Sequence, residues 1–485
     1  MSTATYPVNE AMLREWFADC GDVKLMTHQV GKEEVRSEVL LIYSDGMVDK
    51  VKITQLVLPP LQATTLRIDE AIPLLPIELI PLLPEQHDEA SISTLVFSGN
   101  LLLYFEAIGK MYLFDIANIP GRYPEESNIE VSIRGPKDGF TENIEQNLAL
   151  IRRRIPSTTL ACEFWELGTR SRTKTALLFL KDVTQDEVIE DIRSRLNAIS
   201  LESVLTLAHL EDVLNTSYIG LFPLLAHSGR PDFVSQCLID GRFVIMLDGN
   251  PTASIAPATL PLLLKSPEDA HFPYLSVAFG RLLRLLGFFI SIFLPGFFIS
   301  LNNFHQDQLP FPLLATITNS RLGLPFSATQ EMLFILILME IFREAGARLP
   351  SSIGQTLTVV GGLIIGDAAI RAGLISPTMV VVTAITIVAS STIGNQTLGG
   401  ILATLRFTVF FISASIGLFG FFMSFLLLLV YLASMHSFGL PYLSPISPLN
   451  LRDLPKAILK LPRNAYKRRP EALQTKEPDK GESES

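Results

Sequence analysis

Apolar residues follow two patterns along this sequence, and the first extends to residue 270. In it, short β-rich runs alternate with amphipathic segments. KTALLFLK (174–181) predicts a strand, and TLVFSGNLLLYFEAIGKMYLFDI (94–116) predicts a strand, a turn and further strands. FVSQCLIDGRFVIMLDGNPTASIAP (233–257) has two Asp-Gly turns between β-rich stretches, which predicts a meander. We therefore expect an α/β soluble N-terminal region made of two α/β subdomains, 1–130 and 131–270.

Two segments of this region have the spacing of amphipathic helices. In FTENIEQNLALIRRRI (140–155), Thr141 is placed to cap the helix, and Arg152–Arg154 lie in the last turn, where the helix dipole favours cations. The triplet could also bind phosphate, but the dipole explains it more simply. In TQDEVIEDIRSRLNAI (184–199), Thr184 and Glu187 have the spacing of a capping box.

The second pattern consists of apolar blocks, which predict an all-α polytopic transmembrane domain over 280–435. The blocks are 285–301, 325–342, 355–375, 376–393 and 401–434. The last exceeds one span of about 20 residues, so it is one long helix or two short ones with a break at GLFG (417–420). With both ends on the cytoplasmic side the number of crossings is even, which favours six unless block 325–342 does not fully cross. The tail 436–485 is basic and then polar, and we expect disorder from residue 470. Basic residues in the 343–350 loop and in the tail place both on the cytoplasmic side.

Charged residues occur inside these apolar blocks. Segment 355–375 contains Asp367 and Arg371, which would cost about 5–7 kcal/mol near the centre of a span, against about −4.5 kcal/mol from its large apolar residues. Block 325–342 carries Glu331 and Glu340, and Arg406 lies in the last block. Two interpretations stay open. In the first, Glu340, Asp367, Arg371 and Arg406 face an aqueous or ion-conducting interior. In the second, Asp367 and Arg371, four residues apart, form a structural pair, or they and Arg406 lie near the membrane surface.

Small residues recur next to these charges and predict close helix packing. One stripe consists of Gly362, Gly366, Ala369 and Gly373, and a second of Ser413, Gly417, Gly420 and Ser424. Such helices are suited to packing on protein rather than on lipid alone.

Charge and motif content exclude several classes of function. Of the whole net charge of −10, the residues up to Arg284 contribute −13, which argues against a nucleic-acid partner. The N-terminus lacks a signal peptide pattern, so we expect the soluble region in the cytoplasm. The three cysteines and seven histidines have no metal-ligand spacing, and no catalytic or cofactor motif is present. We expect no enzyme activity, no cofactor and no bound metal.

Several segments together resemble the A subunit of the GerA family of spore germinant receptors. They are IRGPKDGFTENIEQNLALIRRRI (133–155), RTKTALLFLKDV (172–183), SGRPDFVSQCLIDGRFVIMLDGNPTASIAPATL (228–260), ARLPSSIGQTLTVVGGLIIGDAAIRAGLISP (347–377) and HSFGLPYLSPISP (436–448). The matched motif positions are Gly135, Pro136, Gly139, Phe140, Asn147, Arg230, Pro231, Asp232, Arg348 and Pro350. One departure is Ser228-Gly229, where the family commonly has Thr-Glu.

The resemblance implies a multi-pass protein of the spore inner membrane with its N-terminal domain and tail on the core side. It would act with a transporter-like B subunit and a lipoprotein C subunit to sense small germinants and trigger ion release. A homo-oligomer of the chain would form the ion pathway. The alternatives are a membrane transporter of a small substrate and a membrane-anchored scaffold subunit.

Overall fold

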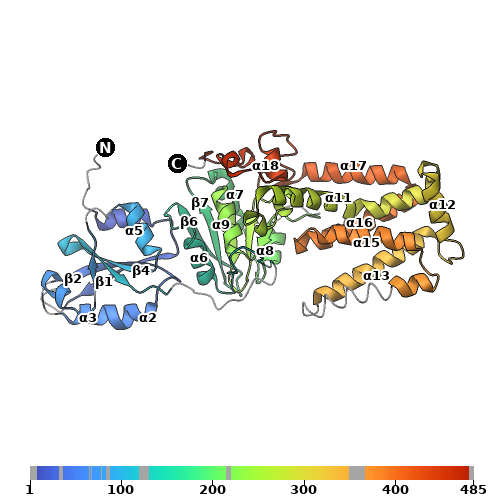
Figure 1. The fold of residues 1–485 in the computed structure, drawn as a ribbon. Coiled ribbons are helices and arrows are strands. Elements are labelled where there is room, and N and C mark those ends of the chain that lie inside the picture. Colours follow the sequence, from blue (N-terminus) through green and yellow to red (C-terminus); the bar gives the residue numbers. More distant parts are fainter. Residues whose placement is uncertain are drawn as a thin grey trace.

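The computed structural model of the chain describes residues 8–31, 36–64, 66, 68–77, 79–83, 88–118, 130, 132–214, 220–348 and 366–479. Two parts that contain β-sheets are followed by a bundle of long helices, and together they form an elongated molecule (Figure 1). The structure thus has the α/β N-terminal region and the all-α C-terminal region that the sequence predicts.

The first sheet is antiparallel, with the strand order β1 (Val23–Val30), β2 (Ser37–Ser44), β4 (Asn100–Phe105), β5 (Lys110–Asp115) and β3 (Ile80–Pro81). Alternate residues of β2 enter two separate cores, with Leu41 on one face and Leu40 on the other. Helices α1 (Glu10–Trp16) and α5 (Glu89–Val96) cover the face of Leu40, while α3 (Leu58–Ala63) covers the other. Because both faces of the inner strands β2 and β4 are buried, these two strands read as nearly continuous apolar runs, whereas the edge strand β1 has exposed residues within it.

The second sheet is also antiparallel, with the order β6 (Leu160–Leu167), β7 (Thr173–Leu180), β9 (Phe243–Leu247), β10 (Ala253–Ala256) and β8 (Ala226–Ser228). Helices α6 (Ile144–Arg152) and α9 (Pro231–Ile239) pack in one core. Helices α7 (Asp186–Asn197) and α8 (Leu207–Leu214) pack in the other.

Local predictions in the sheet region were partly wrong. The strand predicted at the start of 94–116 belongs instead to α5, which Asp88 caps through a bond from the backbone N–H of Ser91. Likewise, the start of the predicted meander 233–257 forms α9, although its second Asp-Gly turn does join β9 to β10. Local sequence misled here because short apolar runs fit a buried helix as well as a strand.

Both predicted helix caps were also wrong. The cap of α6 is Asn143, which accepts bonds from the N–H groups of Glu145 and Gln146, and Thr141 pairs instead with Asn147. Helix α7 begins after Gln185 without a side-chain cap, and the hydroxyl of Thr184 is buried without a partner in the described part of the chain.

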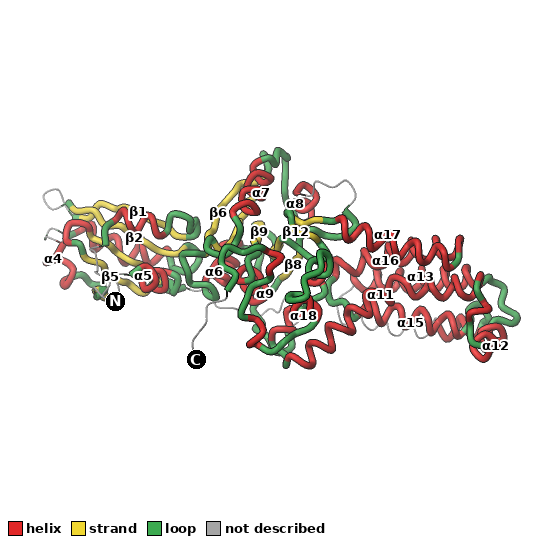
Figure 2. The backbone as a smooth tube through the Cα atoms, turned by 90° about the horizontal axis from the view of Figure 1, so that it is seen from above, coloured by secondary structure: helices red, strands yellow, loops and turns green. Residues whose placement is uncertain are grey.

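The helical region is built around α11 (Tyr274–Phe304), which packs against α13 (Ala328–Arg348), α15 (Pro377–Ser391), α16 (Gln396–Ile416) and α17 (Leu418–Ser434). Helix α12 (Phe311–Ser320) lies at the end far from the sheets (Figures 1 and 2). Among the described residues, two helices are long and apolar enough to cross a membrane, 274–304 and 397–416, while α15 and α17 are shorter apolar helices.

The predicted break in block 401–434 is confirmed at Gly417, between α16 and α17. Its φ of +70° and ψ of −148° lie in a region that only glycine adopts readily. A Cβ there would lie 3.0 Å from the ring of Phe304 in α11. The chain therefore reverses direction at this point, and α17 returns to the sheets (Figure 1).

The C-terminal segment lies against the second sheet region, so the disorder expected from residue 470 was wrong up to residue 479. Nε of Arg469 donates to the carbonyl of Ile239, and Nζ of Lys476 donates to the carbonyl of Lys181. Helix α18 (Leu454–Ile458) precedes this segment and packs beside α10 (Leu260–Leu263) and α11.

Candidate functional site

Asp367 and Arg371 form an ion pair in the helical region. They lie in a helical segment, 366–371, and Nε of Arg371 is 2.8 Å from Oδ2 of Asp367. The Arg371 side chain is 79% exposed and that of Asp367 is 56% exposed. The pair thus lies on an open surface of this chain. The orange helical segment 366–371 that contains it lies near the end of the bundle far from the sheets (Figure 1).

Glu340 and Arg406 lie apart from that pair. Glu340 on α13 accepts a 2.8 Å bond from Nε of Arg343, and both side chains are partly exposed. Arg406 is buried in the middle of α16, where Nε donates to the carbonyl of Ser291 in α11 at 2.7 Å. The structure therefore brings together Asp367 with Arg371, but does not gather all four predicted groups in one site.

The predicted small-residue stripes have different surroundings. Gly362 lies outside the described residues, Gly366 faces open space, Ala369 is buried in a core with α13 and α15, and Gly373 ends the helical segment with φ +63°. In the second stripe, Ser413 faces Gly296 of α11. Gly420 lies so close to the backbone of α16 that a Cβ on it would be 2.6 Å from the carbonyl oxygen of Ile412. Ser424 is buried and donates to the carbonyl of Gly420.

Glu331 is a buried carboxylate that was not among the residues predicted to form the site. Its side chain is completely buried, Oε2 accepts from the hydroxyl of Ser376 at 3.1 Å, and Nε of Arg321 lies 3.9 Å away. Oε1 has no hydrogen-bond partner among the described residues. The sequence signal that could have identified Glu331 is a glutamate within an apolar block.

Two of the signature segments meet at the joint between the second sheet region and α11. Arg230, at the start of α9, donates to both carboxylate oxygens of Asp232 at 3.0 and 2.6 Å and also contacts Glu268. Nε2 of His271 lies 3.0 Å from Asp232. A Cβ on Gly135 would be only 2.2 Å from Nη2 of Arg230, so this arrangement needs glycine there.

Backbone contacts tie the same two segments together. The N–H of Phe140 donates to the carbonyl of Gly229, and Asn147 makes two bonds with the backbone of Thr141. Glu130 accepts bonds from the hydroxyl of Ser228 and the N–H of Gly229, the two positions that depart from the family pattern. Of the remaining signature residues, Pro231 is the first residue of α9, and Pro136 and Gly139 lie in the loop before α6. Pro350 and the side chain of Arg348 lie outside the described residues.

A second buried ion pair joins the two sheet regions. Nε and Nη2 of Arg152 donate to the two carboxylate oxygens of Asp22 at 2.7 and 2.6 Å, and both side chains are almost fully buried. The guanidinium also lies over the ring of Phe97, 4.2 Å from its centroid. Burial opposes the charge of Arg152, but the charge and hydrogen bonds of Asp22 raise its pKa overall. From the sequence, the helix dipole or phosphate binding was the expected role of Arg152, and this pair was not predicted.

Within the part of the chain that the structure describes, no three His, Cys, Asp or Glu side chains are grouped to hold a metal ion. The chemistry of these clusters is that of ion pairs and hydrogen bonds.

A family model described as Bacillus/Clostridium GerA spore germination protein matches residues 11–472. The chain belongs to the GerA family. It is 39% identical over 481 residues to spore germination protein XA of Bacillus anthracis, covering 97% of this chain and 96% of that protein. It is 31% identical over 469 residues to spore germination protein KA of Bacillus subtilis (strain 168), covering 96% and 86%.

A solved structure is also similar to this GerA-family chain. It is the crystal structure of the N-terminal domain of the A subunit of the Bacillus megaterium spore germinant receptor GerK3, with 24% identity and a TM-score of 0.38. The alignment covers 52% of this chain and 93% of that one.

The ammonium group of Lys265, near the joint of this GerA-family chain, has no partner among the described residues. Lys265, between α10 and α11, is partly buried, and within the described residues its Nζ makes no hydrogen bond or ion pair. Burial, together with the positive charges of Arg281 and Arg242, lowers its pKa from the ordinary 10.5 to about 8.

Replacing Lys265 with methionine is therefore expected to stabilise the folded chain in detergent. Since the folded state disfavours the charged lysine, the native residue costs up to about 3 kcal/mol below pH 8. This cost fades as the pH rises from about 8 to about 10.5, where the unfolded chain also loses the proton. Denaturant midpoints of both proteins at neutral and alkaline pH measure the difference. A methionine variant that is less stable at neutral pH would contradict this account.

Proposed function

We propose that this chain is the A subunit of a nutrient germinant receptor in the spore inner membrane and that it forms an ion pathway as a homo-oligomer. Membership of the GerA family supports the receptor role. The transporter-like B subunit and the lipoprotein C subunit are its partners, and nutrient binding leads to ion release. The chain itself acts by coupling and conduction rather than by enzyme chemistry.

The observation that carries the ion pathway is the exposed Asp367–Arg371 pair on the bundle surface. A charged side chain in contact with lipid hydrocarbon costs about 2.5–3.5 kcal/mol near the centre of a span and less toward the surface. The Glu340–Arg343 pair is also partly exposed on a neighbouring apolar helix. Another copy of the chain, or water between copies, would cover these charges and remove the cost.

The buried clusters support a coupling role for the sheet region. Arg230 connects the second sheet to Glu268, which lies just before α11, and Arg152 connects the second sheet region to the first. A movement of the sheet region against a partner subunit would therefore reach α11 through fixed ion pairs rather than through a flexible linker.

Replacing Asp367 with asparagine tests the ion pathway. In the receptor reconstituted with its partner subunits, we expect unchanged nutrient binding and a loss of nutrient-triggered ion flux of about ten-fold or more, because one charge of the path is removed. Lost nutrient binding would favour a transporter that binds its own substrate. Unchanged binding and flux would favour a scaffold.

The exchange variant Asp367→Arg/Arg371→Asp is the matched control. It keeps an i, i+4 pair of opposite charges but reverses their positions. If the pair only stabilises the fold, the exchange restores the flux that Asp367→Asn loses. If the pair faces moving ions, flux stays low or the selectivity between cations changes.

A further inference from the structure

A large cavity lies between the second sheet region, the start of α11 and the C-terminal segment. Its volume is about 1420 Å³, and seven of its lining side chains are Lys or Arg against four Asp, a net of +3. The whole chain has a net charge of −10. Five of the seven cations are Arg242, Lys265, Arg281, Lys456 and Lys460.

Most of the acidic groups in this cavity are already engaged by the protein. Asp232 is held by Arg230 and His271, Asp269 by Arg281 and Arg284, and Asp453 lies 3.4 Å from Lys456. Lys265 has no partner in the described part of the chain. Arg242 donates there only through Nε, to the carbonyl of Pro257 at 3.1 Å. The same ion pairs neutralise Arg281 and Lys456, whereas Lys265 and Arg242 are cations without a carboxylate partner in the described part of the chain, and an anion would balance their charge.

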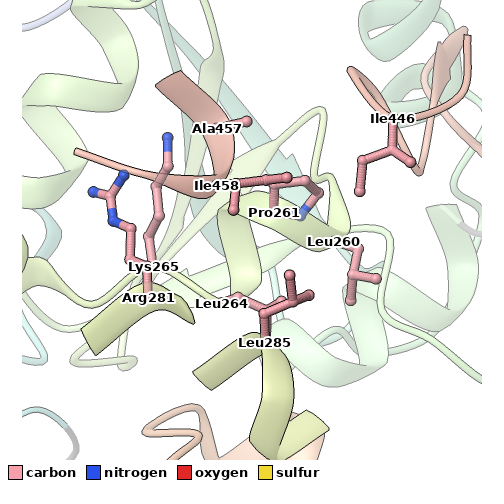
Figure 3. Close-up of a pocket in the computed structure, with 9 residues that line it drawn as sticks. All are labelled: Leu260, Pro261, Leu264, Lys265, Arg281, Leu285, Ile446, Ala457 and Ile458. Carbon is pink, nitrogen blue, oxygen red and sulfur yellow. The ribbon is translucent and has the colours of Figure 1, made fainter. Parts of the chain in front are cut away.

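An apolar slot adjoins these cations (Figure 3). It has a volume of about 30 Å³ and is lined by Leu260, Pro261, Leu264, Leu285, Ile446, Ala457 and Ile458 together with Lys265 and Arg281. In Figure 3 the side chains of Lys265 and Arg281 run side by side, and their nitrogens lie at the end away from Leu264 and Leu285. A ligand here would meet cations at one end and aliphatic carbon at the other.

The place of the slot along α11 indicates which kind of anion it suits. Arg281 lies in the second turn of α11, and the uninterrupted apolar stretch begins at Leu285. Beside the slot, Leu282 and Leu286 are 47% and 57% exposed. If α11 spans the membrane, as the proposed function requires, the cations lie at the level of lipid headgroups and the exposed leucines at the level of acyl chains.

We propose that this cavity binds the phosphate of an anionic phospholipid, with Lys265 and Arg281 as its contacts and the acyl chains along α11. The ligand chemistry is a phosphate attached to an aliphatic chain. Free phosphate would share the ionic contacts but would gain nothing from the apolar slot. A bound lipid would fix the start of α11 relative to the joint formed by Arg230.

Binding is tested with the full-length chain in nanodiscs or detergent, by native mass spectrometry with phosphatidylglycerol and, as the neutral comparison without a phosphate, diacylglycerol. We expect Lys265→Gln to weaken phosphatidylglycerol binding about ten-fold or more, since one contact to a charged group is lost, and to leave diacylglycerol binding unchanged. Lys265→Arg should restore the affinity. The matched control is Lys181→Gln, because Lys181 pairs with Asp19 outside the cavity.

Two further arms separate the sources of phosphate and the role of charge. Inorganic phosphate in excess should not displace phosphatidylglycerol, and equal competition by free phosphate would overturn the lipid assignment. Raising the pH from about 7 to about 9 should weaken binding to the parent chain but not to Lys265→Gln. Equal phosphatidylglycerol binding by parent and Lys265→Gln, both folded as judged by thermal unfolding, would also overturn the proposal.

These results are independent of the ion-flux test. If the chain inserts into nanodiscs and its receptor conducts ions, but lipid binding does not depend on Lys265, the lipid inference fails alone. If the chain does not insert at all, the proposed membrane function fails as well.

Discussion

Replacing Asp22 with alanine should destabilise the chain by about 3–5 kcal/mol, because it leaves the buried guanidinium of Arg152 without its counter-ion. Asp22 lies between α1 and β1 in the first sheet region, whereas Arg152 ends α6 in the second. Without this ion pair, the two sheet regions should unfold in separate transitions. Trp16 and Trp165 are the two tryptophans of the chain, one in each region, so denaturant unfolding followed by fluorescence measures it.

Two comparisons make this result specific. Asp19→Ala removes the partly exposed pair with Lys181, which bridges the same two regions, and should cost less than about 1 kcal/mol. The double variant Asp22→Leu/Arg152→Met replaces the pair with apolar side chains and should recover most of the loss. If Asp22→Ala costs no more than Asp19→Ala, the buried pair does not hold the regions together.

The class of the fold could be predicted from the sequence because the two hydrophobic patterns depend only on local spacing. Block 401–434 also revealed its own break, since its length exceeds one span and Gly417 allows a backbone conformation closed to other residues. Helix α5 could not be distinguished from a strand, because its apolar residues are few and β4 follows it directly. The cap of α6 could not be assigned from the sequence, because Thr141 and Asn143 are both suitable capping residues near the helix start. In the structure Thr141 contacts Asn147, and Asn143 caps the helix.

The ion pairs of the helical bundle and of the sheet regions could be predicted only in part. The charges of Asp367 and Arg371 are conspicuous in an apolar block, and their pairing follows from helix spacing. Arg152 and Asp22 are separated by 130 positions, and each fits an ordinary local role. Lys265, which has no partner among the described residues, has no sequence signal either, because its lowered pKa arises from burial and from the charges of Arg281 and Arg242, which the fold brings close.

Replacing Arg230 with lysine should lower the free energy of unfolding by about 3 kcal/mol or more, although the charge is kept. The reason is that an ammonium group cannot hold Asp232 through two parallel bonds and also reach Glu268. Denaturant unfolding of the full-length chain measures the loss. Arg193→Lys is the matched control, since Arg193 pairs with Glu163 on the surface and its replacement should cost less than about 1 kcal/mol. Gly135→Ala should disturb the same cluster, because its Cβ would meet Nη2 of Arg230.

The acid dependence of stability gives an independent measure of the same cluster. Burial alone would raise the pKa of Asp232, but hydrogen bonds from Arg230 and His271 lower it below its ordinary value. The paired carboxylate therefore stabilises the folded state fully above about pH 4, the ordinary value, and this contribution is lost as the pH falls through the lower folded pKa. In Arg230→Lys the carboxylate loses its strongest partner, so the parent chain should lose more stability on acidification than the variant does. Equal acid dependence in the two proteins would mean that Arg230 does not set the ionisation of Asp232, and the joint before α11 would have to be held by other contacts.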